Sequence, residues 1–301
     1  MLRYGRAAAL GILADRWLGE PPADLHPVAG FGTLMERVEE HTYRDGRAAG
    51  AAHALVGVGV AALAGRALPA TSLATCVAVA GRSLGATAAA VGAALTAGDL
   101  DEGRRLLPAL VGRDPAGLDD KEIARAVVES VAENTVDAVV APALWAAAAG
   151  APAVLAHRAV NTLDAMLGHR NERYARFGWA SARLDDLAAY GPARATAALV
   201  AACRPRTTRA VWTAVRRDAP AHPSPNSGVA EAAFAAALGL RLGGESRYGD
   251  RVELRPPLGT GRPPGARDIA AAVRLSRDVS LALAGALFLA GAADRRRRRR
   301  P

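Results

Sequence analysis

The chain has 301 residues, of which 51% are hydrophobic but only 4% aromatic, and its formal net charge is +9. This apolar content excludes an intrinsically disordered chain, and only two cysteines, far apart in the sequence, exclude a disulfide-stapled extracellular scaffold. The positive charge is almost entirely arginine and no nucleic-acid-binding motif accompanies it, so we predict no nucleic-acid partner.

Several stretches in the first third of the chain are almost free of charge. Residues 7–14 follow two arginines but are too short for a membrane span and lack a clear cleavage site, which indicates a retained N-terminal helix. Stretches 48–65, 67–81 and 83–98 are separated by single arginines and are rich in alanine and glycine. This composition is typical of helices that pack closely against other helices.

Two later stretches favour a membrane protein. Residues 138–156 are uncharged and approach the roughly 20 apolar residues that a spanning helix needs. The two prolines within this stretch are tolerated in a membrane bundle. Residues 279–293 are followed by Asp294 and the arginine run 295–300, as expected of a last spanning helix anchored by cytoplasmic positive charge.

The predicted fold class is therefore all-α: a multi-pass membrane helical bundle with polar loops and amphipathic helices that form a site at the membrane boundary. We expect a single integral-membrane domain over residues 1–293, followed by a basic tail over residues 294–301. The Gly/Pro-rich segment 243–267 is predicted to be an irregular loop, and no strand is expected. A soluble, alanine-rich helical bundle is the alternative.

Glu129, Glu133 and Asp137 are spaced at i, i+4 and i+8, so a helix would place three carboxylates on one face. Like charges at this spacing repel each other, and a bound cation removes that cost. Oxygen ligands of this kind suit Mg²⁺ that is shared with substrate phosphate. The alternative is a solvated face paired with Arg125. Asn134, beside Glu133, favours a functional site.

A second group of polar residues begins with Arg158, Asn161 and Asp164, which share a helix face. Arginines bind carboxylate or phosphate in a bidentate manner, and Asp or Asn can hold a metal or a donor group. An ion-pair network between amphipathic helices is the alternative. The later members of this group are Arg173, Arg183, Asp185 and Asp186.

The third group is the proline-rich segment His222–Gly228, which precedes Glu231. Its prolines stiffen the loop, and Ser227 is placed to cap a helix that starts at Val229. Such a loop can present backbone N–H groups to phosphate at a helix start, with His222, Ser224 and Asn226 as candidate ligand-binding residues. A purely structural turn is an equally good interpretation.

Taken together, these motifs resemble the CobD/CbiB family of cobalamin biosynthesis proteins. They occur in the family's order, span most of the chain and are specific as a set. Two positions depart from the family pattern: Val229-Ala230 replaces Trp-Pro, and Ala189 replaces Asn. The matching segments are Glu20–Val28, Arg125–Thr135, Asn161–Met166, Arg170–Tyr174, Phe177–Asp186 and His222–Gly228.

The resemblance implies a multi-pass enzyme of the inner (cytoplasmic) membrane, adenosylcobinamide-phosphate synthase, with the arginine tail on the cytoplasmic side. The implied reaction uses ATP and Mg²⁺ to join aminopropanol phosphate, or aminopropanol, to the free propionate carboxylate of adenosylcobyric acid. The lipid bilayer, a second copy of the chain as a homo-oligomer, and other corrinoid-pathway enzymes are the implied partners. A membrane transporter or binding component for a corrinoid or another anionic solute is the alternative function, and a structural subunit of a corrinoid-making assembly is a third.

Under this interpretation, Glu133, Asp137 and Asp185 are catalytic, and Glu129, Glu133 and Asp137 bind the metal. We expect these groups to converge at the membrane boundary. The residues expected to bind substrate are Asn134, Arg158, Asn161, Asp164, Arg173, Arg183, His222, Ser224 and Asn226.

Overall fold

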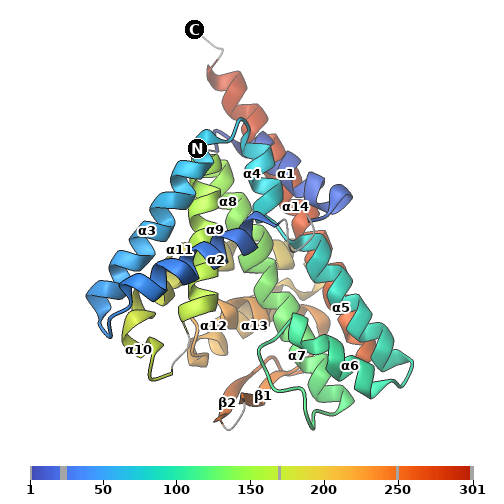
Figure 1. Cartoon of the computed structure of the whole chain (residues 1–301). Coiled ribbons are helices and arrows are strands. Elements are labelled where there is room, and N and C mark those ends of the chain that lie inside the picture. Colours follow the sequence, from blue (N-terminus) through green and yellow to red (C-terminus); the bar gives the residue numbers. More distant parts are fainter. Residues whose placement is uncertain (1, 21–25, 169–170, 249–250, 299–301) are drawn as a thin grey trace. The chain divides into compact units, whose positions relative to one another are not determined.

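The computed structural model describes residues 2–20, 26–168, 171–248 and 251–298, and the chain is mostly helical (Figure 1). The chain forms two compact units, each built from segments that are distant in the sequence, and a single integral-membrane domain over residues 1–293 stays a prediction. The first unit comprises residues 1–80, 137–191 and 283–301, and the second comprises residues 81–136 and 192–282.

The first unit is a helical bundle in which α3 packs against α9, and α1 packs against α4 and α8. Its core contains Met35, Leu163, Leu167 and Phe177. Gly50 contacts the backbone carbonyl of Phe177, so a side chain at this position would force α3 away from the core. The helices are α1 (Gly5–Leu18), α2 (Pro27–Thr42), α3 (Arg47–Ala67), α4 (Thr71–Ala78), α8 (Ala141–Ala149), α9 (Ala151–Leu167), α10 (Tyr174–Phe177) and the first half of α11 (Trp179–Cys203).

The apolar stretch 138–156 is not one helix, so the prediction of a membrane span there is wrong. It begins in a π-helix (Val136–Val140) and continues into α8, which has nine residues. The chain then turns at Gly150, whose φ of 81° is a left-handed value that favours glycine, before α9 begins. At 1.5 Å per residue, α8 extends only about 14 Å, roughly half of a hydrocarbon core.

The second unit packs α13 against α7 and α12, and packs α7 against α5 and α6. Helix α7 starts at a capping box, in which the Asp119 carboxylate accepts from the Glu122 N–H at 2.8 Å and Glu122 accepts from the Asp119 N–H at 2.9 Å. The elements are α5 (Gly81–Thr96), α6 (Leu100–Leu106), α7 (Asp120–Thr135), the second half of α11, α12 (Thr208–Arg217), α13 (Ser227–Leu238), β1 (Leu242–Tyr248) and β2 (Arg251–Leu258).

A β-hairpin stands where we predicted an irregular loop and no strand. Strands β1 and β2 pair antiparallel, with a register irregularity between Leu242 and Gly244. The guanidinium of Arg125 on α7 donates to the carbonyls of Gly243, at 2.7 Å, and Glu245, at 2.5 Å. Strand β1 is held by an arginine that is more than 100 residues away in the sequence. Local sequence patterns around residues 243–267 therefore did not predict the hairpin.

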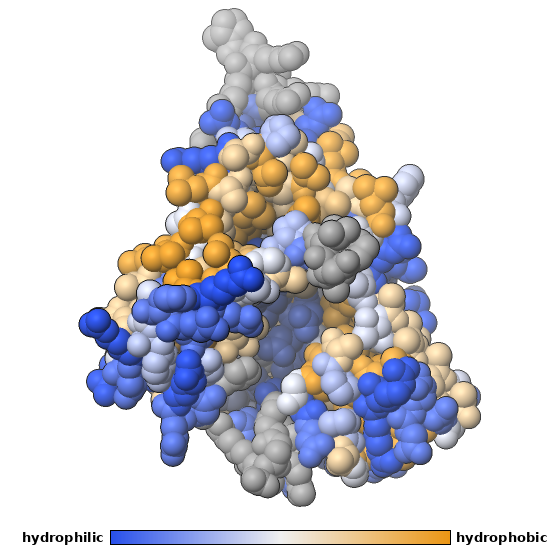
Figure 2. All heavy atoms as spheres, viewed as in Figure 1, coloured by the Kyte–Doolittle hydropathy of each residue, from blue (hydrophilic) through white to orange (hydrophobic). Residues whose placement is uncertain are grey.

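Three segments are long and apolar enough to cross a membrane: Arg47–Ala67 in α3, Thr71–Thr96 in α4 and α5, and Ala266–Asp294 in α14 (Ala266–Arg298). The last of these includes the predicted span 279–293, and the helix continues through Arg298 into the predicted tail. Figure 2 shows hydrophobic residues gathered over α3, where Leu55 is 68% and Leu63 is 63% exposed. Exposed large apolar side chains on such a helix are typical of a membrane protein.

Candidate functional site

A polar cluster in the second unit is built on α7 and α13, and Glu129 is its most enclosed acidic residue on α7. The Glu129 carboxylate accepts from the Arg113 guanidinium and, at 2.9 Å, from the Gly243 N–H. Arg125 lies 3.9 Å from the same carboxylate. Because Glu129 is only 2% exposed and has these partners, it connects α7 to the segment before it and to the hairpin.

Glu133 lies one turn further along α7 and is half-buried. Its Oε1 accepts from the Ser227 hydroxyl at 2.8 Å, which links α7 to the first residue of α13. The amide of Asn134 donates to the carbonyl of Ser130 at 3.0 Å, within its own helix. Glu133 is therefore the more accessible of the two α7 carboxylates in this cluster.

The predicted loop before α13 folds around Ser224. The Ser224 hydroxyl accepts from the N–H groups of Asn226 and Ser227, each at 3.2 Å, and Asn226 accepts from Arg194 at 3.1 Å. We expected these N–H groups to face phosphate, but Ser224 is their partner here. We also expected Ser227 to cap a helix from Val229; instead α13 begins at Ser227, whose hydroxyl binds Glu133.

His222 approaches α13 because residue 228 is glycine. A Cβ on Gly228 would lie 2.5 Å from the His222 Cβ, so any larger residue would push the imidazole away from the helix. The Ser224 N–H donates to Nδ1 of His222 at 3.1 Å. The Ser224 carbonyl oxygen also lies 3.1 Å from Nδ1, so both backbone groups of Ser224 hold this side of the imidazole, and the tautomer decides whether Nδ1 accepts or donates.

Glu231 is a member of this cluster that the sequence reasoning left out of the site. It is 0% exposed, and its Oε1 lies 3.7 Å from Nε2 of His222 and 4.0 Å from Nη1 of Arg255. Neither carboxylate oxygen has a hydrogen-bond partner among the described residues. The signal was present, because Glu231 is the only charged residue in the apolar segment 229–238.

Burial raises the pKa of Glu231 well above its ordinary value, and the nearby carboxylates of Glu129 and Glu133 act in the same direction. Burial also lowers the pKa of His222. Burial therefore favours the uncharged form of both groups, which avoids the cost of a net charge in the interior.

Protonated Glu231 makes stability depend on pH. Because its pKa is higher in the folded state, its contribution is fully present below the unfolded pKa, near 4.5, and is lost as the pH rises through the folded value. The isosteric variant Glu231→Gln does not titrate. We expect the wild-type Tm to fall relative to that of the variant between pH 5 and 9, measured by circular dichroism in detergent; parallel profiles would contradict a raised pKa.

A second polar cluster lies in the first unit, on α9 and α11. Nη1 of Arg158 donates to Oδ1 of Asn161, and the Asn161 amide donates to Oδ1 of Asp185, both at 3.3 Å. Burial lowers the pKa of Arg158, while the carboxylates of Glu20 and Asp137 oppose this shift. The first unit therefore brings Asp137, Arg158, Asn161 and Asp185 into one electrostatic neighbourhood.

The other predicted residues of this unit have different partners. Arg173 binds Glu39 at 2.8 Å and lies over the ring of Tyr43, which connects α10 to α2. Arg183 pairs with Asp186 at 3.3 Å on the surface. At the end of α9, a Cβ added at Gly168 would clash with Oδ1 of Asp164, so the glycine leaves room for this carboxylate. Residues 21–25 and Arg170, which belong to the predicted motifs, lie outside the described residues.

Among the described residues, no group of three or more His, Cys, Asp and Glu side chains is placed to hold a metal ion. Glu129 is held by Arg113, and the π-helix at Val136–Val140 interrupts the helical spacing that we assumed for Asp137. Mg²⁺ commonly takes one or two carboxylates together with substrate phosphates. Glu133, in the second unit, and Asp137, in the first, each have a half-buried carboxylate that by itself suits that mode of binding.

The three long apolar segments suggest a helical membrane protein, and the described residues also form clusters of carboxylates, arginines and amides. The chain belongs to the CobD/CbiB family, since the family model described as CobD/Cbib protein matches residues 8–276.

Three relatives share the printed name Cobalamin biosynthesis protein CobD. The protein from Mycobacterium tuberculosis is 51% identical over 294 residues, which cover 93% of each chain. The protein from Chromobacterium violaceum is 42% identical and covers 88% of this chain and 90% of its own. The protein from Geobacter metallireducens is 41% identical, with 86% and 87% covered. No solved structure matches the chain.

Both departures from the family pattern lie in packed positions. Val229 and Ala230 are buried on α13, and Ala189 is buried on α11. The substitutions therefore alter the packing of these two helices and remove no charged candidate.

Proposed function

We propose that the chain acts in cobalamin biosynthesis as an adenosylcobinamide-phosphate synthase. The observation that supports this proposal is its similarity, over most of its length, to proteins named for cobalamin biosynthesis. The reaction joins the free propionate carboxylate of adenosylcobyric acid to the amine of aminopropanol phosphate or aminopropanol. It consumes ATP and releases ADP and phosphate.

A carboxylate and an ammonium group do not condense unaided in water. In the proposed reaction, the carboxylate is first phosphorylated at the expense of ATP, which gives ADP and an acyl phosphate. The ammonium group loses a proton, its nitrogen attacks the acyl carbon, and the C–O bond to phosphate breaks. The protein therefore has to bind anions and accept one proton from the amine.

The cluster in the second unit suits the proton transfer. Glu133 is its accessible carboxylate and accepts the ammonium proton in our proposal, while the Ser227 hydroxyl keeps the carboxylate in position. His222 lies between half-buried Ser224 and buried Glu231, at 3.7 Å from the latter. In this arrangement Glu231 positions His222 and does not touch the substrate.

The cluster in the first unit suits an anionic group. Arg158 supplies a half-buried guanidinium for carboxylate or phosphate, and Asn161 and Asp185 hold the orientation of that side chain. Asp137 in this unit and Glu133 in the second unit are separate candidate ligands in the proposal, and either would hold Mg²⁺ through its carboxylate. The ion, when bound, neutralises phosphate charge.

We further propose that the protein is a multi-pass protein of the cytoplasmic membrane with its C-terminus inside. Three apolar segments support membrane insertion. Helix α14 leads directly into the arginine run, and positive charge beside a spanning helix favours the cytoplasmic side.

The proposal is tested with the purified full-length chain in detergent, incubated with adenosylcobyric acid, ATP, Mg²⁺ and aminopropanol phosphate. Mass spectrometry should detect the amide product only when all four are present, and a parallel reaction with aminopropanol identifies the preferred amine. Folded protein that binds the corrinoid and yields no product would contradict the ligase and favour the transporter.

A further inference from the structure

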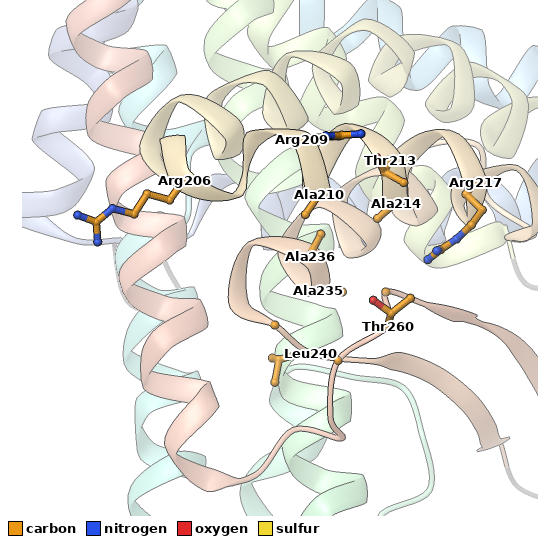
Figure 3. A pocket seen from close by; sticks show the side chains of 13 residues that line it. Arg206, Arg209, Ala210, Thr213, Ala214, Arg217, Ala235, Ala236, Leu240 and Thr260 are labelled. Atoms are coloured by element: carbon orange, nitrogen blue, oxygen red, sulfur yellow. The ribbon is translucent and has the colours of Figure 1, made fainter.

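A cavity of about 500 Å³ lies in the second unit, and no residue of either polar cluster lines it. It is enclosed by α12, the C-terminal end of α13 and the segment that follows β2 (Figure 3). None of the residues that we predicted for the site lines it. The polar lining residues are Arg206, Arg209, Thr213, Arg217 and Thr260.

The lining combines positive charge with an apolar floor. Three arginines and two threonines supply N–H and O–H donors, and none of the described lining residues is acidic. The floor is formed by Ala235, Ala236 and Leu240. Hydrogen-bond donors of this kind bind anions, and the apolar floor can cover a hydrophobic part of the ligand. The lining therefore suits an organic anion.

Arg217 is held in place before any ligand arrives. Its Nε and Nη2 donate to the two carboxylate oxygens of Asp218, at 2.5 and 2.8 Å. The Gly259 N–H donates to the same carboxylate at 2.9 Å, so Asp218 connects α12 to the segment that carries Thr260. The Arg217 guanidinium and the Gly259 N–H lower the pKa of Asp218, which is therefore charged at neutral pH.

Arg217 and Thr260 both line the cavity, whereas the side chain of Arg206 extends away from these two residues in Figure 3. The bonds to Asp218 use Nε and Nη2 of Arg217 and leave Nη1 for a ligand. Planar guanidinium groups and hydroxyls are common phosphate-binding groups. The volume lies within the range of about 300–1,000 Å³ that small-molecule sites occupy.

We propose that this cavity binds the phosphate group of an organic phosphate, which Arg217 and Thr260 hold while the apolar floor covers the rest of the molecule. The ligand chemistry is a phosphate ester, either a free small molecule or the headgroup of an anionic lipid. Binding at this site does not depend on the ligase activity proposed above.

The test is equilibrium binding of the full-length chain in an uncharged detergent, with ATP, aminopropanol phosphate and short-chain phosphatidylglycerol as separate probes. Because a charge-assisted hydrogen bond contributes about 1.5–3 kcal/mol, we expect Arg217→Ala to weaken binding of at least one probe by about 10-fold or more. Thr260→Val should weaken binding of the same probe. The probe that binds identifies the source of the phosphate.

Arg216→Ala is the matched control, because Arg216 is the adjacent exposed arginine and does not line the cavity. It removes the same charge and should leave the affinity within about 2-fold. If Arg216→Ala and Arg217→Ala weakened probe binding equally, the loss would come from the lower net positive charge and not from the cavity. That result would overturn the proposal. Absence of wild-type binding to all three probes would overturn it too. Tm measurements confirm that each variant is folded.

Discussion

Glu133→Gln should lower kcat for amide formation by about 10²–10⁴-fold, the range typical of a lost general base. The substitution keeps the size of the side chain and leaves an oxygen that accepts from the Ser227 hydroxyl, which contacts Oε1 at 2.8 Å. It removes the negative charge and the capacity to take a proton. The measurement is product formation at saturating substrates, together with its pH profile, in which the acidic limb should disappear.

The matched control is Glu102→Gln, the same change at an exposed glutamate on α6 that pairs with Arg105. Its kcat should equal that of the wild-type protein. If Glu133→Gln turned over at a near-normal rate while retaining the wild-type Tm, neither the base role nor the metal role of Glu133 could stand.

Arg113→Met should destabilise the second unit more than any surface substitution. It leaves the Glu129 carboxylate, which is only 2% exposed, without the guanidinium that it accepts from. Removing one partner of a buried ion pair costs about 3–5 kcal/mol, because the remaining charge stays buried and poorly compensated. The expected fall in Tm is roughly 10 °C, measured by thermal unfolding in detergent.

The double variant Arg113→Met/Glu129→Gln separates the charge effect from lost packing. Glutamine is neutral and still accepts from the Gly243 N–H, so most of the lost Tm should return. Arg105→Met, at an exposed pair, should leave the Tm unchanged. A double variant as unstable as Arg113→Met would show that the buried charge is not the cause.

Two parts of the candidate site were accessible from the sequence. The sequence placed Asn161 and Asp185 in one group of polar residues, and the structure brings these two side chains into contact, while their functional roles stay a prediction. Helical spacing also predicted that Glu129 and Glu133 lie on successive turns of one helix. These inferences succeeded because they depend on local periodicity and on residue chemistry.

Other parts depend on contacts that no local pattern encodes. The spacing could not show that Arg113 binds Glu129, since these residues come from different elements. Sequence reasoning assigned no role to Glu231, which α13 places in the interior, 3.7 Å from His222. The assumed helix through Asp137 failed at a π-helix, which local propensity does not predict.

By itself, the sequence determined the helical character, the apolar segments of α3 and α14, the family and most of the charged candidates, because composition and periodicity are properties of short segments. Only the tertiary structure decided that the chain turns at Gly150, that Arg125 holds a β-hairpin, and which carboxylates are enclosed or accessible. The physical reason is that residues far away along the chain determine which side chains are buried and which partners they have. Burial and pairing in turn decide which backbone conformation is stable and whether a side chain is charged.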